Sequence, residues 1–112
     1  MSNKSIEDIV LQFSTRGMDI LYENFPNSYT ANASKKLLNI KKGTIFLYTG
    51  FYLAGHAETD GPIGTYFLYK SLKILGYKPI IITDLFCENF FKECETIYIS
   101  HDDCNETYFL SL

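Results

Sequence analysis

The first 40 residues repeat large apolar side chains with the period of a helix. After Ser5 the apolar positions three or four apart are Ile6, Ile9, Val10 and Phe13. Ser5 and Asp8 have the spacing of a capping box, which favours a helix start at this point. The pattern restarts at Met18, after Arg16-Gly17, and again at Tyr29, after Pro26-Asn27. The sequence therefore predicts two or three short helices within residues 1–42.

The period changes after Gly43. Residues 44–49 form an unbroken run of β-branched and aromatic side chains, which is typical of a strand buried on both faces. A second apolar run covers residues 79–84, and a third covers residues 96–100. We expect a strand at each of these three segments.

A helix is predicted between the first two strands, with Pro62 in its first turn and Gly76 at its end. On a helical wheel one half carries Ile63, Gly64, Phe67, Leu68, Ser71, Leu72, Ile74 and Leu75, and we expect this half to pack. The other half carries Thr65, Tyr66, Tyr69, Lys70 and Lys73, which we expect to face water. Gly64 and Ser71 lie near the centre of the packing half, where small side chains would allow a close approach to the sheet.

A strand, helix and strand of this length join parallel neighbours through a right-handed crossover. Residues 85–93 resemble a second short helix that leads to the third strand. The predicted fold class is α/β, a three-stranded parallel Rossmann-like sheet with βαβ crossovers, preceded by two or three helices. We expect residues 1–112 to form a single α/β domain, with a helical part at 1–42, a βαβαβ part at 43–100 and a short tail at 101–112.

Composition agrees with a folded domain and excludes some partners. Apolar residues make up 46% and charged residues 21% of the 112 residues, which is ordinary for a globular chain. The net charge of −3 argues against nucleic acid, because binding to a phosphate backbone needs clustered Lys and Arg. No apolar run approaches the length of a membrane span. We expect a cytoplasmic location, and we interpret Cys87, Cys94 and Cys104 as free thiols.

The carboxyl ends of parallel strands meet at one edge of a sheet, where ligands bind in open α/β folds. The residues predicted to gather there are Thr49, Gly50, Glu58, Thr59, Asp60, Thr83, Asp84 and His101. Glu58 and Asp60 are two carboxylates beside a helix amino terminus, whose N–H groups and dipole can anchor a substrate carboxylate. Neighbouring carboxylates separate each other's pKa values, so one can serve as an acid and the other as a base.

Other interpretations stay open for the loop that joins the first predicted strand to the helix containing Pro62. Thr59 and Asp60 can simply cap the helix while Glu58 faces water. Gly50 and Gly55 have the spacing of a phosphate loop, but His56 and Ala57 stand where Lys and Ser/Thr would be needed. A divalent metal held by Glu58, Asp60, Asp84 and Asp102 is conceivable, although no spacing specifies it and no cofactor is predicted. His56 has a pKa suited to proton transfer.

Several segments together resemble the D-glutamate cyclase carboxy-terminal domain family. They are Thr49-Gly50-Phe51, Glu58-Thr59-Asp60-Gly61-Pro62-Ile63-Gly64, Leu72 to Gly76 and Ile82-Thr83-Asp84, with Arg16-Gly17 resembling the start of the domain. The resemblance covers roughly residues 6–100. It implies an α/β enzyme domain of cytosolic or mitochondrial type that converts D-glutamate to 5-oxo-D-proline.

The resemblance suggests roles for the loop residues. We expect Glu58 and Asp60 to be catalytic, one freeing the amine and one helping the hydroxyl to depart. Residues expected to bind the substrate, a small carboxylate such as D-glutamate, are Arg16, Thr49, Gly50, Thr59, Gly61, Gly64 and Asp84. The helix start from Gly61 to Gly64 would hold the α-carboxylate, and the Arg16 guanidinium can clamp a carboxylate at two points.

Domains of this family continue past the third strand. We therefore expect this chain to be the amino-terminal portion of a larger domain and to be an inactive fragment if the missing portion is required for catalysis. A three-stranded parallel sheet has two open edges. We therefore expect poor solubility, a homo-oligomer or a partner that covers an edge. Two further functions stay open: a non-catalytic module that binds a protein through its aromatic surface, and a domain that binds a small ligand or divalent metal without turnover.

Overall fold

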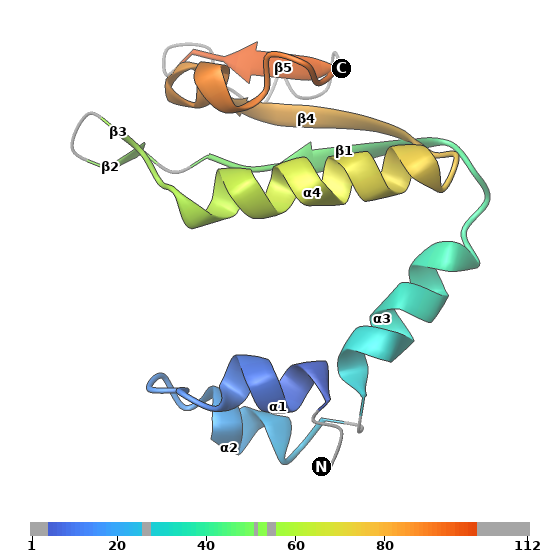
Figure 1. Cartoon of the computed structure of the whole chain (residues 1–112), viewed down its shortest axis with the longest axis vertical. Coiled ribbons are helices and arrows are strands. Elements are labelled where there is room, and N and C mark those ends of the chain that lie inside the picture. Colours follow the sequence, from blue (N-terminus) through green and yellow to red (C-terminus); the bar gives the residue numbers. More distant parts are fainter. Residues whose placement is uncertain (1–4, 26–27, 51, 54–55, 101–112) are drawn as a thin grey trace. The chain divides into compact units, whose positions relative to one another are not determined.

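The computed structural model describes residues 5–25, 28–50, 52–53 and 56–100. The chain forms two compact units, Met1–Lys41 and Lys42–Leu112, which we name the N-terminal and C-terminal units and describe separately (Figure 1). The boundary coincides with the predicted change from helical to βαβ pattern. The expectation of a single domain stays a prediction.

The N-terminal unit consists of three helices, as predicted: α1 (Ile6–Leu11), α2 (Met18–Tyr22) and α3 (Tyr29–Leu38). The capping box is also confirmed. The Ser5 N–H donates to Asp8 Oδ2 at 2.9 Å, and the Asp8 N–H donates to Ser5 Oγ at 3.1 Å. These two bonds satisfy donors that the first turn of a helix leaves unpaired.

A contact between distant residues joins α1 to α3. The Glu7 side chain is buried, and its Oε1 accepts hydrogen bonds from the Thr30 N–H at 2.9 Å and from the Thr30 hydroxyl. These hydrogen bonds lower the pKa of Glu7, because they stabilise the ionised carboxylate. The carboxylate also lies at the amino end of α3, where a negative charge is favoured.

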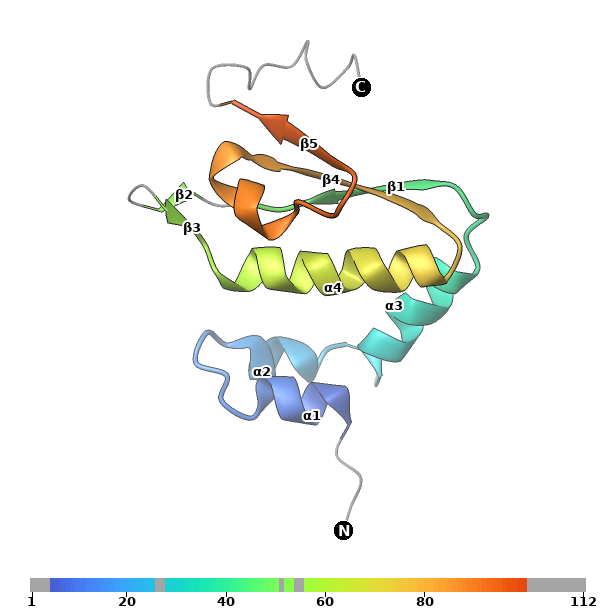
Figure 2. The same ribbon diagram turned by 45° about the horizontal axis from the view of Figure 1, so that its top comes forward.

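The C-terminal unit contains the predicted parallel sheet (Figure 2). Its strands are β1 (Thr44–Tyr48), β4 (Lys78–Asp84) and β5 (Thr96–Ile99), in the order β1-β4-β5. Both neighbouring pairs are parallel, with Leu47 level with Ile81 and Ile82 level with Ile97. The α/β class and the three-stranded parallel sheet are therefore confirmed.

One face of this sheet is covered by α4 (Asp60–Ile74), which ends where Gly76 adopts a φ of +84°, as predicted. A 3-10 helix, η1 (Leu85–Phe90), packs against both α4 and the sheet. The core between these layers consists of Tyr69, Ile81, Cys87 and Phe91, with Leu47 and Cys94 packed against it.

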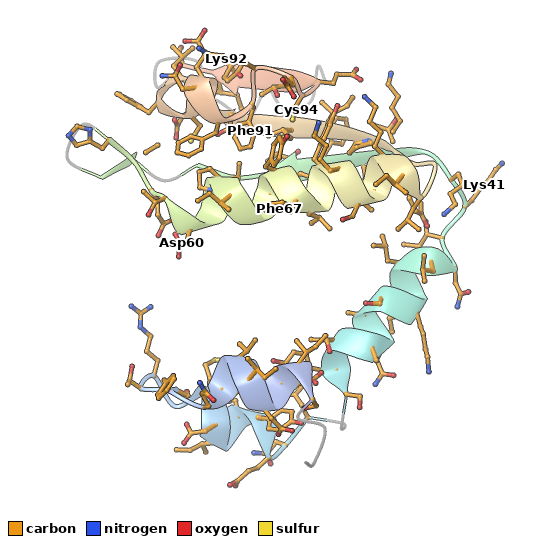
Figure 3. The ribbon with its side chains drawn as sticks, viewed as in Figure 1. Lys41, Asp60, Phe67, Phe91, Lys92 and Cys94 are labelled. Atoms are coloured by element: carbon orange, nitrogen blue, oxygen red, sulfur yellow. The ribbon has the colours of Figure 1, made fainter. Side chains whose placement is uncertain are left out.

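The predicted packing face of α4 is wrong at most positions, although Leu72 is buried as predicted. Tyr69, assigned to the wet half, is only 2% exposed, whereas Phe67, assigned to the packing half, is 65% exposed and points away from the sheet (Figure 3). Tyr69 can be buried because its hydroxyl accepts a hydrogen bond from the Glu95 N–H at 2.9 Å. Gly64 and Ser71 are exposed, so neither mediates a close approach to the sheet.

The burial expected for the first strand is also wrong. β1 alternates between half-buried and exposed positions, with Phe46 42% and Tyr48 65% exposed. The reason is topological: β1 is at the edge of the sheet, and its second face is not covered by α4 or η1.

Two local predictions in this unit need correction. The helix expected over residues 85–93 is a 3-10 helix that ends at Phe90, and Cys87 and Cys94 both contribute to the core. The segment from Gly50 to Gly61, which we expect from the sequence to be a loop, contains a short antiparallel hairpin, β2 (Tyr52–Leu53) and β3 (His56–Ala57).

Candidate active site at the carboxyl edge of the sheet

The carboxyl ends of β1 and β4 lie at the same level, as the predicted site requires. Tyr48 pairs with Ile82 in the parallel register, and the Thr49 N–H continues the ladder by donating to the Ile82 carbonyl oxygen at 3.1 Å. Thr83 and Asp84 therefore follow on β4 where Thr49 and Gly50 follow on β1. The edge between them is the place where an open α/β sheet binds ligands.

Gly50 lies directly against the end of β4. A Cβ built on Gly50 would be 2.7 Å from Asp84 Oδ2 and 2.7 Å from Thr83 Oγ1, and its φ is +111°. No side chain fits at that distance, and the backbone conformation strongly favours glycine. The sequence at this position is therefore explained by a close approach of the backbone to two polar side chains.

Gly61 brings the start of α4 to the same edge. A Cβ built on Gly61 would lie 3.3 Å from Thr49 Oγ1 and 3.7 Å from Glu58 Oε2. The Glu58 carboxylate and the Thr49 hydroxyl thus flank the first turn of α4. We define the acidic rim as Thr49, Gly50, Glu58, Gly61, Thr83 and Asp84, the residues that these contacts join.

The first turn of α4 offers few hydrogen-bond donors to an external anion. Asp60, at the start of the helix in Figure 3, accepts through Oδ1 from the Gly61 N–H at 3.0 Å. Pro62 has no N–H, and Thr59 occupies the N-cap position without a capping bond from its side chain. An anion at this helix start would therefore compete with Asp60 for the Gly61 N–H.

Asp84 is held in place by the element that follows it. Its Oδ1 accepts from the Phe86 N–H at 2.9 Å and so caps η1, while its Oδ2 faces the Gly50 backbone. This arrangement fixes one oxygen by a structural bond and directs the other to the acidic rim.

The Thr83 and Cys87 side chains lie next to each other at the end of β4; the sequence placed Thr83 at this edge but did not place Cys87 there. Thr83 is 3% exposed, and its hydroxyl has no hydrogen-bond partner of good geometry among the described residues. Burial raises the pKa of the Cys87 thiol, and the Thr83 hydroxyl beside it acts in the opposite direction. The alternation of β4 was the available signal, because it puts Thr83 on the same face as the core residue Ile81.

Other predicted residues are not among those that the contacts defining the acidic rim join. Arg16 is exposed in the turn between α1 and α2 of the N-terminal unit. Gly64 is exposed one turn into α4 with nothing within 4 Å of a built Cβ, and His56 is exposed on β3. His101 and Asp102 lie outside the described residues, and so does Cys104. The roles predicted for Arg16 and Gly64 stay predictions.

Within the described ranges, no group of three or more His, Cys, Asp and Glu side chains is placed to hold a metal ion. The set of Glu58, Asp60 and Asp84 is therefore not such a group. None of the helices in the described part of the chain combines the length and apolarity that a bilayer crossing requires.

The N-terminal unit has a cavity of its own, of about 180 Å³. Its lining is aliphatic and aromatic, formed by Leu11, Met18, Tyr22, Phe25 and Tyr29. Such a lining offers no carboxylate or imidazole for proton transfer, so the acidic rim is the better candidate for acid-base chemistry.

Comparison with known proteins gives one assignment. The family model described as "D-glutamate cyclase-like, C-terminal" matches residues 6–110, almost the whole chain. No match was found among curated proteins or among solved structures. The family match spans the three strands, α4 and every residue of the acidic rim. The chain therefore belongs to the D-glutamate cyclase-like, C-terminal family.

Proposed function

We propose that the chain acts as a lyase of amino-acid metabolism in the cytoplasm, converting D-glutamate to 5-oxo-D-proline and water. Membership of the D-glutamate cyclase-like family supports this activity. The observation that carries the proposal is the position of the Glu58 carboxylate, 3.7 Å from a Cβ built on Gly61 and on the same rim as Asp84. The substrate is a small carboxylate, and no cofactor takes part.

The reaction is intramolecular. The amine nitrogen of D-glutamate attacks the carbon of its own side-chain carboxyl group, a C–N bond forms, and a C–O bond breaks. The nitrogen loses a proton, and the departing hydroxyl gains one, so that water leaves. The enzyme has to deprotonate the amine, protonate the leaving hydroxyl and hold the substrate in a folded conformation.

Glu58 and Asp60 share the two proton transfers in this scheme. Glu58 is the better candidate for the base, because its carboxylate lies beside Gly61 at the acidic rim and no capping bond of α4 uses it. Asp60 keeps one oxygen on the Gly61 N–H, which leaves its second oxygen for a proton transfer.

Holding the substrate falls to the remaining polar groups of the rim. The Thr49 hydroxyl can donate to a carboxylate oxygen, and the Asp84 Oδ2 can accept from the substrate amine. The helix start contributes less than expected from the sequence, because Asp60 occupies the Gly61 N–H. Arg16 and Gly64 remain candidates for the α-carboxylate, as do Thr59 and the first turn of α4.

The test is a direct assay of the purified full chain with D-glutamate, with chromatographic detection of 5-oxo-D-proline. Wild type should form the product from the D but not the L enantiomer. Glu58→Gln should lower the rate by about 100-fold or more, the usual size of a lost general base. Glu93→Gln is the matched control, since Glu93 is 79% exposed and only ion-pairs with Lys70 at the surface, and its rate should equal wild type.

Two results would count against the proposal. A folded wild-type chain that forms no product at saturating D-glutamate is not a cyclase. If Glu58→Gln forms the product at the same rate as Glu93→Gln, Glu58 takes no part in the mechanism, and Asp60 becomes the candidate for the general base.

A further inference from the structure

The outer edge of β1 carries a regular set of backbone groups that the sheet does not use. The Lys78 N–H donates to the Gly43 carbonyl at 2.9 Å, and the Thr49 N–H donates to the Ile82 carbonyl at 3.1 Å. In a parallel ladder, alternate residues turn both backbone groups toward the same neighbour. Odd-numbered residues of β1 therefore bond to β4, and the N–H and C=O groups of Thr44, Phe46 and Tyr48 point to the open edge.

This edge lacks the features that usually prevent strand pairing. Natural proteins protect an edge with Lys, Pro, a bulge or a covering element. β1 reads Thr-Ile-Phe-Leu-Tyr, without a charge or a proline, and no described strand pairs with its outer side. Such an edge is a template for a second strand.

One register of a second copy pairs every outward group of this edge. If two β1 strands run antiparallel about a two-fold axis at Phe46, Phe46 lies opposite its own symmetry mate and Thr44 lies opposite Tyr48. These are the positions that turn both backbone groups outward, so each N–H meets a C=O of the other copy. A shift by one residue would oppose outward groups to inward ones. The strand is therefore self-complementary about one residue.

The side chains favour the same arrangement. Leu47 packs into the core on the α4 side, so its neighbours Phe46 and Tyr48 project from the other face, where they are 42% and 65% exposed. Pairing about Phe46 brings the two Phe46 rings together and places each Tyr48 beside a Thr44. Aromatic pairs across strands stabilise a sheet. The dimer would thus cover apolar surface that a single copy leaves exposed.

We propose that the chain forms a two-fold homodimer by antiparallel pairing of β1 strands about Phe46, which joins two three-stranded sheets into one. The surface is specific to a second copy, because the same five residues supply both sides of the contact. The dimer does not depend on catalysis at the acidic rim.

The first test is the mass of the full chain in solution by light scattering after size exclusion, at micromolar concentrations. Wild type should have twice the chain mass of 12.9 kDa. Phe46→Lys should raise the dimer dissociation constant by about 100-fold or more, because both copies place a charge at the axis. Phe67→Lys, which changes an exposed aromatic residue of α4, is the matched control and should stay dimeric.

Two further measurements test the register. Phe46→Cys should form an intermolecular disulfide on mild oxidation, because Cα atoms of a hydrogen-bonded antiparallel pair are about 5.5 Å apart, within the range of a disulfide. Phe67→Cys should not. Amide exchange should show Thr44, Phe46 and Tyr48 protected in wild type and fast in Phe46→Lys, with Ile45 and Leu47 protected in both.

The same exchange data distinguish dissociation of the dimer from unfolding of the chain. A dissociated variant loses protection only at Thr44, Phe46 and Tyr48, whereas an unfolded variant loses protection at Ile45 and Leu47 as well. A monomeric wild type, a dimer that Phe46→Lys leaves intact, or aggregates without a defined mass would each overturn the proposal.

Discussion

The two units of the chain are stabilised by different kinds of interaction. Among the described residues of the N-terminal unit, the one buried side chain is the carboxylate of Glu7. The C-terminal unit buries several large apolar side chains, among them Tyr69, Leu72, Ile81 and Phe91. The N-terminal unit thus depends on an ionised hydrogen-bonded group, whereas the C-terminal unit depends on the removal of apolar surface from water.

This difference explains where the candidate chemistry lies. An acidic rim needs backbone segments that are held rigidly enough to keep carboxylates in place. β1, β4 and α4 supply this rigidity through the core around Phe91 and through the approach of Gly50 to Asp84. This comparison leads to three predictions, given in order of decreasing expected effect.

The largest effect is expected from the C-terminal core. Phe91→Ala should lower the free energy of unfolding of that unit by about 3–5 kcal/mol, through lost burial and a new cavity. Phe90→Ala, the adjacent and partly exposed ring, should cost much less. Urea unfolding followed by near-ultraviolet circular dichroism measures both. Equal costs for the two variants would mean that the core is not centred on Phe91.

An intermediate effect is expected at the acidic rim. Gly50→Ala should destabilise the C-terminal unit by about 1–3 kcal/mol, because its φ of +111° and the nearby Thr83 and Asp84 oxygens exclude a methyl group. Gly64→Ala is the matched control, since it lies in a helix with open space around it, and it should stabilise by about 0.5–1 kcal/mol. Thermal melts of the two variants should shift in opposite directions, and shifts of the same sign would contradict the geometry.

The smallest effect is a dependence of the N-terminal unit on pH. Hydrogen bonds from Thr30 lower the pKa of Glu7 in the folded state, so its contribution to stability is complete above the unfolded pKa of about 4.5. That contribution should disappear as the pH falls through the lower folded pKa, because the carboxylate then binds a proton. Helical circular dichroism between pH 7 and pH 3 should show the loss.

Two variants check the assignment to Glu7. Glu7→Gln should already be less helical at neutral pH and should lack this acid transition. Glu23→Gln, which changes an exposed carboxylate at the end of α2, should titrate like wild type. An acid transition that persists in Glu7→Gln would assign the effect to another group.

Local patterns predicted the elements of both units, but not which faces are buried. The capping box at Ser5, the three parallel strands and the end of α4 at Gly76 depend on neighbouring residues, and the sequence shows them directly. The orientation of α4 was missed because Tyr69 counts as polar on a helical wheel, although its hydroxyl finds a partner in Glu95. The bond between Glu7 and Thr30 joins residues 23 positions apart, which no periodic pattern reveals.

The candidate site was predictable to the same extent. Parallel strands bring their carboxyl ends together, so the proximity of Gly50 to Asp84 followed from two apolar runs and one helix between them. The occupation of the Gly61 N–H by Asp60 and the buried Thr83 hydroxyl did not follow, because both depend on side-chain orientations within the folded unit.

The central claim is that residues from β1, β4 and the start of α4 form one binding edge. A titration of the ¹⁵N-labelled chain with D-glutamate tests it most directly. The amide signals of Thr49, Gly50, Gly61 and Asp84 should shift together with a single dissociation constant, while Gly76 at the far end of α4 stays unchanged. Signals that do not move, or that follow separate binding constants, would contradict a common site.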